Sequence, residues 1–343
     1  MSRYIIRRLL QAIPLLFLIS LVLFVLMQSI GDPLATMSGR TPTRKEDRER
    51  LTRQLGLDKP IIVQYVYWLV GNDWAKVDMD GDGVAETPGT RKGVLRGDWG
   101  TSIKLREKVT TLIGQRLPNT LILMLTAEAV IIFSSLILGV YSALRQYSLM
   151  DNIVTGISFI GYSMPIFFIA LGTIYIFSVY FKRWGLPSLP AVGMFDFKEG
   201  KTFGQVVLHL ILPVFSMAFI SMAGYSRYVR GTMLEVLGQD YIRTAKAKGL
   251  PRREIVFIHA LKNASLPIVT IIGLELPLLL GGAVVTEKIF AWPGMGRLFI
   301  DQLEDGDTPV VMGILMLIAV AVILFQLITD IVYAWLDPRI RYK

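Results

Sequence analysis

A run of alternating acids carries the metal-binding pattern in this sequence. Four carboxylates and one backbone carbonyl fall on positions 1, 3, 5, 9 and 7 of a calcium-loop pattern: Asp78, Asp80, Asp82, Glu86 and Val84. Gly83 stands at position 6, where the loop needs a sharp turn, but position 12 is Gly89 rather than an acid. The sequence leaves two interpretations open, a weak calcium site of the extracellular kind and a solvated acidic turn.

Other common reactive sites are missing from the sequence. Gly200-Lys201-Thr202 lacks the glycine of a phosphate loop, because Phe195 stands five positions before Gly200, so we expect no ATP site in this chain. The sequence has no Cys and only two His, which argues against thiolate nucleophiles, Cys-based metal sites and metal catalysis. We therefore expect no cofactor bound by this chain apart from calcium at the acidic run.

Composition places the chain in a membrane. Hydrophobic residues make up 53% of 343 positions, and the mean hydropathy is +0.52. These values are too apolar for a soluble protein of this length. The formal charge of +9 is then explained by Lys and Arg in cytosolic loops, so we expect a lipid bilayer and no nucleic acid as partner.

The apolar runs predict an all-α protein with six membrane spans. Each run reaches the roughly 20 residues needed to cross a bilayer core. The first is too long for a signal-peptide core and lacks a cleavage site, so we expect it to be retained. Pro165 interrupts the third run and Pro213 the fourth, and both predict kinks. The spans are expected near 9–30, 118–144, 151–181, 204–226, 265–286 and 309–336.

A long polar segment separates the first two spans. We expect three parts: an N-terminal span at 1–30, an extracytoplasmic insertion at 31–115 and a five-helix core at 116–343 with a cytoplasmic loop at 227–264. Within the insertion, Gly56 ends a charged helix and Pro60 to Val70 predicts an amphipathic one. Short segments assigned to the cytosol hold 15 Lys and Arg, against 6 in the short external loops, so both termini should be cytosolic.

The sequence from 240 to 267 is a polar island between apolar runs. Ile242, Ala245 and Gly249 fall at helical spacing on a narrow face of small residues, and Gly249 suits a left-handed helix end. Pro251 suits the first turn of a second helix, which should run to about Asn263.

The apolar side of that second helix should consist of Ile255, Ile258 and Leu261. Two short helices joined at a glycine, with a small-residue face, are typical of a segment that docks into a groove on another protein. The alternative is an ordinary basic cytoplasmic loop.

The order of residues in this island resembles the cytoplasmic loop of binding-protein-dependent ABC importer permeases. That loop carries the EAA motif: Glu-Ala-Ala, three residues, Gly, and a later Leu-Pro. Here Arg243, Thr244, Ala245 and Gly249 occupy those places, and Leu266-Pro267 closes the pattern. The departures at Arg243 and Thr244 are similar to the B-type membrane component of dipeptide and oligopeptide importers, in the peptide/nickel branch of the family.

Four more motifs extend the resemblance over most of the chain, apart from about 73–96. They are GDWGTS at 97–102, GYSMPIF at 161–167, EKIFAWPGMGRL at 287–298 and LDPRIR at 336–341. The glycines and proline of the third predict a turn from Phe290 to Gly296 at the external membrane surface, with Trp292 and Phe299 at the interface. A plain interfacial loop is one interpretation. The resemblance implies the other, an external gate or binding-protein contact formed by Trp292, Pro293, Gly294 and Gly296.

The resemblance implies a type I ABC importer permease fold in a prokaryotic inner membrane. The partners would be a homologous permease subunit of the C type, two ATP-binding subunits that hold ATP and Mg, and an extracytoplasmic substrate-binding protein. The chain itself would be non-catalytic. The implied contacts with the ATP-binding subunits are Asp240, Tyr241, Arg243, Thr244, Ala245, Lys246, Ala247, Gly249, Leu250 and Pro251.

Three acids within the predicted spans are candidates for function, because charge is costly in a bilayer. For each of Glu128, Glu275 and Asp330, pairing with a polar group on another helix or on the sister subunit is one interpretation. Asp330 lies near the cytosolic end and fits a structural role, whereas Glu275 is nearer mid-membrane and is also a candidate for the translocation path. The expected cargo is a dipeptide or oligopeptide, with oligosaccharide, nickel chelate and glutathione as alternatives. An ion-coupled secondary transporter and a membrane-embedded enzyme are further alternatives. The first should show an internal repeat with broken helices and the second clustered catalytic groups, and neither is evident.

Overall fold

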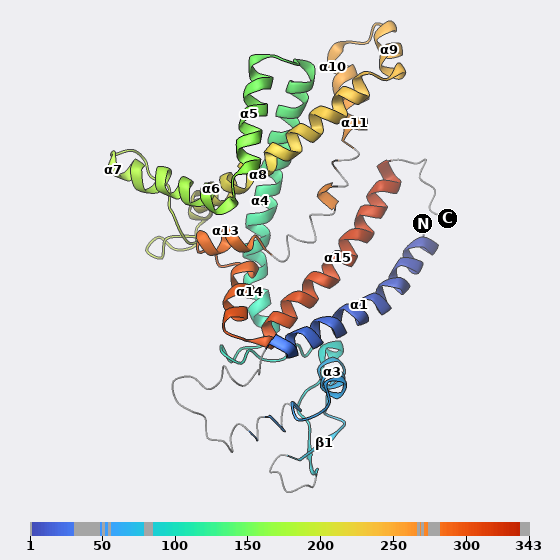
Figure 1. Cartoon of the computed structure of the whole chain (residues 1–343), viewed down its shortest axis with the longest axis vertical. Coiled ribbons are helices and arrows are strands. Elements are labelled where there is room, and N and C mark those ends of the chain that lie inside the picture. The colour runs from blue at the N-terminus through green and yellow to red at the C-terminus, as the bar shows by residue number, and fades with distance from the viewer. Residues whose placement is uncertain are drawn as a thin grey trace. The chain divides into compact units, whose positions relative to one another are not determined.

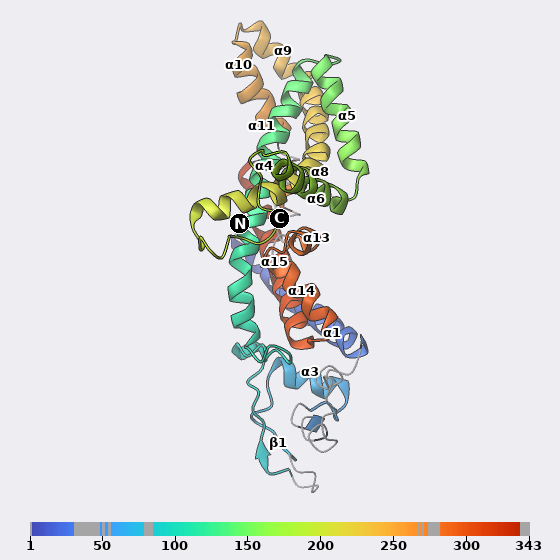
Figure 2. The same ribbon diagram turned by 90° about the vertical axis from the view of Figure 1, so that its left-hand side faces the viewer.

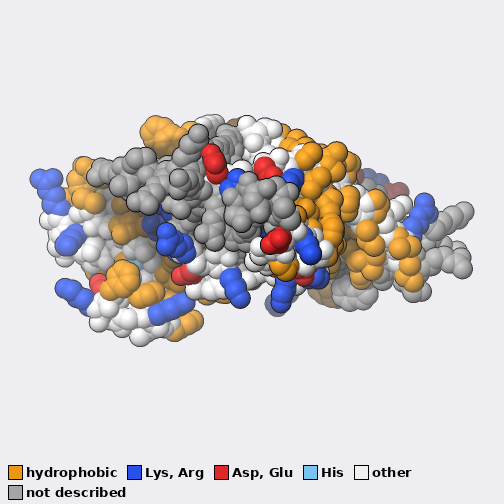
Figure 3. Space-filling view, turned by 90° about the horizontal axis from the view of Figure 1, so that it is seen from below, with side chains coloured by type: hydrophobic (Ala, Val, Ile, Leu, Met, Phe, Trp, Pro, Cys, Tyr) orange, Lys and Arg blue, Asp and Glu red, His pale blue; other side chains and the backbone are white. Residues whose placement is uncertain are grey.

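The computed structural model describes residues 2–30, 49, 52–53, 56–78, 85–265, 268, 271–273 and 282–336. The described residues are mostly helical, and five helices are long and apolar enough to cross a membrane: Ile6–Ser29, Val109–Leu144, Ile166–Arg183, Phe203–Leu237 and Thr308–Ile331. Large apolar side chains on these helices remain exposed, for example Leu10 at 62% and Phe133 at 69%. Figure 3 shows such hydrophobic side chains at the surface of one face. An exposed apolar surface of this kind is suited to lipid or to partner subunits.

The chain divides into two compact units, Met1–Leu117 with Leu298–Ala321, and Pro118–Arg297 with Val322–Lys343. The first unit contains α1 (Ser2–Ile30), α3 (Ile61–Leu69), β1 (Lys76–Val77), β2 (Thr87–Pro88) and the 3-10 turn η1 (Val94–Arg96). It also takes the later part of α14 (Met295–Glu304) and the first part of α15 (Thr308–Leu336).

An aromatic and methionine cluster forms the core of the first unit. Phe24 of α1, Tyr65 and Leu69 of α3, and Met312 and Met316 of α15 are all buried in it. α3 confirms that a helix follows Pro60, but its exposed side carries Ile62 and Val66, so the prediction of an amphipathic helix is wrong. Gly56 has the left-handed φ of +69° expected of a helix end. The segment from 60 to 70 is therefore packed on α1 rather than extended in solvent.

The GDWGTS motif is joined to the start of α15 within the first unit. The Ser102 hydroxyl donates to Asp307 Oδ2 at 2.5 Å, and the Lys104 backbone N–H donates to the same oxygen at 3.1 Å. The Lys104 ammonium also pairs with Asp305. Residues about 200 positions apart are thereby held together by a buried carboxylate.

Long helices form the framework of the second unit: α4 (Val109–Leu144), α5 (Leu149–Ser163) and α8 (Phe203–Leu237). α5 lies along α8 in both ribbon views (Figures 1 and 2). Arg230 of α8 forms a two-pronged ion pair with the buried Asp151 of α5, with both N–O distances at 3.0 Å. The Ser148 hydroxyl caps the start of α5 by accepting from the Asp151 N–H. Sequence reasoning missed this pair, although Ser148-x-x-Asp151 is a helix-start signal.

The prediction of a proline kink in the third span is wrong. α5 ends at Ser163, and Met164 and Pro165 are both extended, with ψ of 133° and 142°. A residue before proline is driven out of the helical region by the ring, so the chain breaks here instead of bending. It resumes as α6 (Ile166–Thr173), the π-helix η2 (Ile174–Tyr180) and α7 (Phe181–Arg183), which Figure 1 shows turned away from α5.

The helix that contains the fourth predicted span is longer than the span itself. α8 continues from Phe203 to Leu237 through Pro213, so the first eleven residues of the predicted cytoplasmic loop are helical. Most of the fifth predicted span lies outside the described residues, as do Leu266, Pro267 and Glu275. The sixth is α15, which begins at Thr308.

Candidate functional site

The polar island folds into two short helical segments that meet at Gly249. The first is α9 (Asp240–Ala247); the second comprises α10 (Arg252–Glu254), the π-helix η3 (Ile255–Ala260) and α11 (Leu261–Ala264). Gly249 has a φ of +76°, and its N–H donates to the Lys246 carbonyl, which confirms the predicted left-handed helix end. Pro251 is extended and precedes α10, so it lies just outside the helix rather than in its first turn.

The small-residue face of α9 points into the chain itself. Ile242 is fully buried and Ala245 is 6% exposed, and both belong to a cluster with Met233 of α8 and with Ile255 and Val256 of η3. The interpretation of this face as a surface for another protein is therefore wrong in this conformation. A helix that must be anchored to its own chain places its small, apolar positions against that chain.

The opposite face of α9 is exposed and polar. Thr244 donates its hydroxyl to the Asp240 carbonyl, and Arg243 lies 3.4 Å from the Asp240 carboxylate. This exposed pair is screened by water, so it defines a chemical surface more than it stabilises the fold. Leu250 lies half-buried at the turn beside this face. The exposed residues are Asp240, Tyr241, Arg243, Thr244, Lys246, Ala247, Lys248 and Gly249.

The apolar side of the second segment differs from the helical prediction. Ile255 is buried, but Ile258 is 57% exposed, and the buried positions are instead Val256, Ala260 and Ala264. η3 is a π-helix, with i→i+5 hydrogen bonds, so its inward positions recur at wider spacing than in an α-helix. The expectation for Ile258 therefore fails because the helical period was wrong.

A hollow of 490 Å³ lies where α4, α8 and this segment meet. Its walls combine apolar side chains with the cations Lys246 and Arg252, and the apolar members are Ala143, Leu144, Leu237, Leu250, Ile255 and Val256. A partly apolar hollow beside an exposed helix is a shape that can receive a side chain of another protein.

The motif at 287–298 folds as a turn between α13 (Val284–Ile289) and α14, which confirms the predicted turn. Its centre is the fully buried carboxylate of Glu287. Thr120 of α4 donates its hydroxyl to Glu287 Oε1 at 2.8 Å, and the Arg297 N–H donates to Oε2 at 2.9 Å. Thr120 in turn accepts from the Met295 N–H at 2.7 Å. Sequence reasoning included Glu287 in the motif but assigned it no role.

Glycines make room for this carboxylate. A Cβ added to Gly294 would lie 2.4 Å from the Glu287 carboxyl, and one added to Gly282 would lie 2.6 Å from it. At Gly296 a Cβ would lie 2.8 Å from the Val284 backbone. Only glycine lets the turn wrap closely around Glu287, which explains the spacing of glycines in the motif.

Trp292 lies inside the protein rather than at the membrane interface. It is fully buried among Leu123, Met194 and Leu210, and its indole N–H donates to the Asn119 carbonyl at 2.9 Å. The Asn119 amide donates back to the Pro293 carbonyl at 2.9 Å. The prediction of an interfacial Trp292 is therefore wrong, because its ring is needed to seat the turn on α4.

Burial is the largest influence on the Glu287 carboxyl and raises its pKa above the ordinary 4.5, while the donated hydrogen bonds oppose that effect. α13 lies outside the five candidate spans. Both carboxylate oxygens are occupied by protein donors, so the arrangement fits a latch that positions the turn and not an acid or base for catalysis.

The predicted calcium loop lies largely outside the described residues, since Asp80, Asp82 and Val84 fall there. β1 and β2 pair antiparallel with Val77 opposite Thr87. This pairing brings the chain at Asp78 and at Glu86 to the base of one hairpin, an arrangement that favours convergent ligands. Within the described ranges, no group of three or more His, Asp or Glu is placed to hold a metal ion.

Two of the three predicted intramembrane acids are described. Glu128 of α4 is buried and Asp330 of α15 is half-buried, and each has an interaction partner. This burial does not decide between the two interpretations of these acids, so pairing and a functional role both stay predictions.

Comparison with known proteins extends over the whole chain. Residues 135–342 match the family described as binding-protein-dependent transport system inner membrane component, and residues 1–124 match its N-terminal counterpart.

Relatives with full coverage of both chains are also found. The chain is 42% identical to the oligopeptide transport system permease protein AppB of Bacillus subtilis (strain 168) and 38% identical to the dipeptide transport system permease protein DppB of Escherichia coli (strain K12). It is 37% identical to the di/tripeptide transport system permease protein DppB of Pseudomonas aeruginosa (strain UCBPP-PA14). With these matches and its apolar helices, the chain belongs to the binding-protein-dependent transport system inner membrane components, the permeases of ABC transporters.

Proposed function

We propose that this chain is the B-type permease of an ATP-driven peptide importer. It would pair with a homologous C-type subunit to form the translocation pathway, and an extracytoplasmic binding protein would deliver dipeptides or oligopeptides. The support for peptide as cargo is that all three relatives, matched from end to end, carry peptide transport in their names.

The observation that supports the coupling role is that α9 is buried on one face and exposed on the other. Its inner face is anchored to α8 and η3 through Ile242 and Ala245, while its outer face is exposed and polar. A partner that binds the outer face of α9 would therefore move α9 together with α8 and η3, against which it packs. ATP-driven closure of two ATP-binding subunits would then switch the pathway between two states, with α9 as a rigid lever.

ATP would be hydrolysed by the partner subunits and not by this chain. ATP and Mg would be held by the ATP-binding subunits, because the sequence of this chain has no phosphate loop. The exposed cations and Tyr241 on α9 would contact those subunits, with the adjacent hollow receiving a partner side chain.

The external turn would serve as part of the gate. Trp292, Gly294 and Gly296 are buried, so their part would be to shape the turn, and Pro293 is the half-exposed member of the set. Glu275 stays a prediction for the pathway.

Copurification and import test the function together. The tagged chain should retain ATP-binding subunits and a second permease, and proteoliposomes of the complex with its binding protein should import dipeptides or oligopeptides. Import of an oligosaccharide, a nickel chelate or glutathione instead would keep the importer and change the cargo. A chain purified without ATP-binding subunits, with uptake driven by an ion gradient, would replace the proposal with a secondary transporter.

Orientation follows from the same proposal. Both termini and α9 should face the cytosol in a prokaryotic inner membrane. Because the chain has no Cys, single substitutions Lys246→Cys and Thr90→Cys report on each side. Only Thr90→Cys should react with an impermeant reagent in intact cells, and external labelling of Lys246→Cys would reverse the topology.

We also propose a weak calcium site at the external hairpin. Repulsion among the four carboxylates would be relieved by the cation, so calcium should raise the midpoint of thermal unfolding relative to a chelator. The matched variant replaces Asp78, Asp80 and Asp82 by Asn, and calcium should no longer raise its midpoint of thermal unfolding. Equal midpoints with calcium and with chelator would leave a solvated turn.

A further inference from the structure

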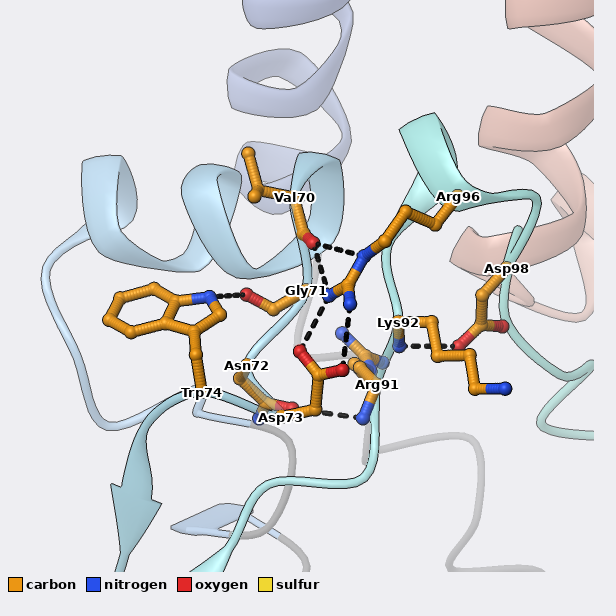
Figure 4. A network of polar contacts seen from close by, with 9 residues as sticks. All are labelled: Val70, Gly71, Asn72, Asp73, Trp74, Arg91, Lys92, Arg96 and Asp98. Carbon is orange, nitrogen blue, oxygen red and sulfur yellow. Dashed lines mark hydrogen bonds and ion pairs between the residues drawn. The ribbon is translucent and has the colours of Figure 1, made fainter.

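A rigid crossing of two backbone segments supports the loop from 89 to 98 in the first unit. A Cβ added to Gly93 would lie 2.3 Å from the Gly71 nitrogen, and one added to Gly71 would lie 2.6 Å from the Arg91 carbonyl oxygen. The segments pass so closely that glycine is required at both positions. Figure 4 shows the polar contacts around this crossing.

The backbone of Arg91 is clamped on both sides. Its N–H donates to the side-chain oxygen of the buried Asn72 at 2.9 Å, and its carbonyl accepts from the Asn72 N–H at 3.0 Å. Arg96 adds an outer brace, because its guanidinium donates to Asp73 and to the Val70 carbonyl. The position from which the Arg91 side chain starts is therefore well fixed.

Arg91 is one of the residues that line a pocket of 110 Å³. Within the described part of the chain, it receives electrostatic support from Asp98 but donates no hydrogen bond to a protein group. Burial lowers the pKa of Arg91 and Asp98 opposes this shift, and arginine stays charged in either case. A partly buried guanidinium with unused donors favours an incoming anion.

Asp98 does not serve as the hydrogen-bonded anion partner of Arg91, because its carboxylate oxygens accept from backbone N–H groups. Its Oδ2 accepts from the Lys92 N–H at 3.0 Å (Figure 4). Its Oδ1 accepts from the Gly100 N–H at 3.1 Å, so both oxygens are used to shape the loop. Among the described residues that line it, the pocket therefore offers a cation with five donors and one carboxylate, that of Asp98, which is already hydrogen-bonded.

The other walls of the pocket are aromatic and apolar. Trp68 of α3, Trp99, Phe24 of α1 and Met312 of α15 face the same space. A cavity of about 150 Å³ holds a benzene molecule, so 110 Å³ suits one small terminal residue and not a whole peptide. Such a pocket, with a guanidinium and apolar walls, fits a carboxylate that carries a short side chain.

We propose that this pocket binds the terminal carboxylate of a peptide, with Arg91 as its anion partner and the two tryptophans beside the last side chain. The site lies where the end of α1 meets the start of α15, under the loop at 93–103, within one compact unit. It rests on the peptide cargo proposed above and would let the permease itself select peptides with a free C-terminus.

The direct test uses the purified complex of permeases and ATP-binding subunits, without the binding protein. Its thermal midpoint is titrated with trialanine, with trialanine amide, and with sodium acetate and sodium phosphate at equal concentrations. Trialanine should raise the midpoint, whereas the amide and the simple anions should have little effect. An equal shift from the amide would overturn the carboxylate contact, and a full shift from acetate or phosphate would overturn the peptide as ligand.

Variants locate the effect. Arg91→Met keeps most of the apolar stem and should raise the apparent Kd for trialanine by at least about tenfold, because a charge-assisted pair is lost. Arg91→Lys should bind with intermediate affinity, since lysine cannot form the two-pronged contact. The matched control is Lys92→Met, an exposed neighbour, which should bind as the wild type does. The shift caused by ATP and Mg shows that each complex is folded.

Import separates this proposal from the function on which it rests. Proteoliposomes with saturating binding protein should import trialanine, and Arg91→Met should raise the KM for import. If the wild type imports trialanine and Arg91→Met binds trialanine as tightly as the wild type, the carboxylate site is rejected and the import function stands. If the complex binds trialanine but imports no peptide, the import function is rejected and the carboxylate site stands.

Discussion

α9 and the turn around Glu287 both place a short segment against the long helices of the second unit, but different groups hold them there. α9 is anchored by apolar side chains, with Ile242 and Ala245 buried against α8 and η3. The turn is anchored by a buried carboxylate, with Glu287 receiving donors from α4 and from its own backbone. Apolar packing is insensitive to small changes in direction, whereas a hydrogen-bonded carboxylate fixes one geometry. Apolar packing therefore holds α9 to its neighbours, whereas hydrogen bonds to one carboxylate set the geometry of the turn. We call α9 the lever and Glu287 with its donors the latch.

The largest effect should come from breaking the latch. Glu287→Met keeps the size but leaves the donors at Thr120 and Arg297 without an acceptor, at a cost of about 3 kcal/mol or more. The thermal midpoint of the purified complex measures it. The same substitution at Glu235, an exposed glutamate near the end of α8, should change the midpoint little. Equal midpoints for both variants would mean that the carboxylate does not hold the turn.

The two faces of α9 should respond differently to one substitution. Ala245→Trp overfills the internal cluster and should destabilise the chain by about 1–3 kcal/mol. Ala247→Trp, on the exposed face, should leave stability within about 0.5 kcal/mol and instead weaken retention of the ATP-binding subunits. Thermal unfolding and copurification measured side by side test this. Loss of partner binding in a stable Ala245→Trp chain would place the docking surface on the inner face after all.

The stability contributed by Glu287 at the turn should depend on pH, whereas the stability contributed by the apolar packing of α9 should not. Because burial raises the pKa of Glu287 above 4.5, the folded chain holds this proton at pH values where the unfolded chain has released it. The contribution of Glu287 to stability should therefore fall as pH rises from about 4.5 through the raised pKa, and then level off. Subtracting the pH profile of Glu287→Gln isolates this contribution. A difference that grows with pH would contradict the sign.

The smallest effect should come from the exposed brace in the first unit. Arg96 holds the pKa of Asp73 below its usual range through a side-chain hydrogen bond. The stability that this pair contributes is therefore fully present above the ordinary aspartate pKa and is lost as pH falls through the lowered pKa. Water and salt screen both groups. Asp73→Asn should lower the midpoint least of these variants, and less still at high salt. A loss as large as that of Glu287→Met would show that the brace carries the crossing at Gly71 and Gly93.

Several features could be predicted from the sequence because their causes are local. Long apolar runs predict membrane helices by length alone, as α4, α8 and α15 illustrate. Gly249 ends a helix because of its own backbone freedom. The glycines after Phe290 are poor residues for a helix interior, which was enough to predict a turn there. The order of motifs was sufficient to identify the family.

Other features depended on which segments meet, and these only the tertiary structure decided. The small face of α9 could have faced a partner or its own chain, and the position of α8 and η3 turned it inward. Glu287 reads as an ordinary loop acid until Thr120, about 170 positions earlier, lies against it. Ser102 and Asp307 are likewise brought together from distant positions, and residues 298–321 join the N-terminal unit. Burial and hydrogen bonding are set by neighbours in space, so no local pattern contains them.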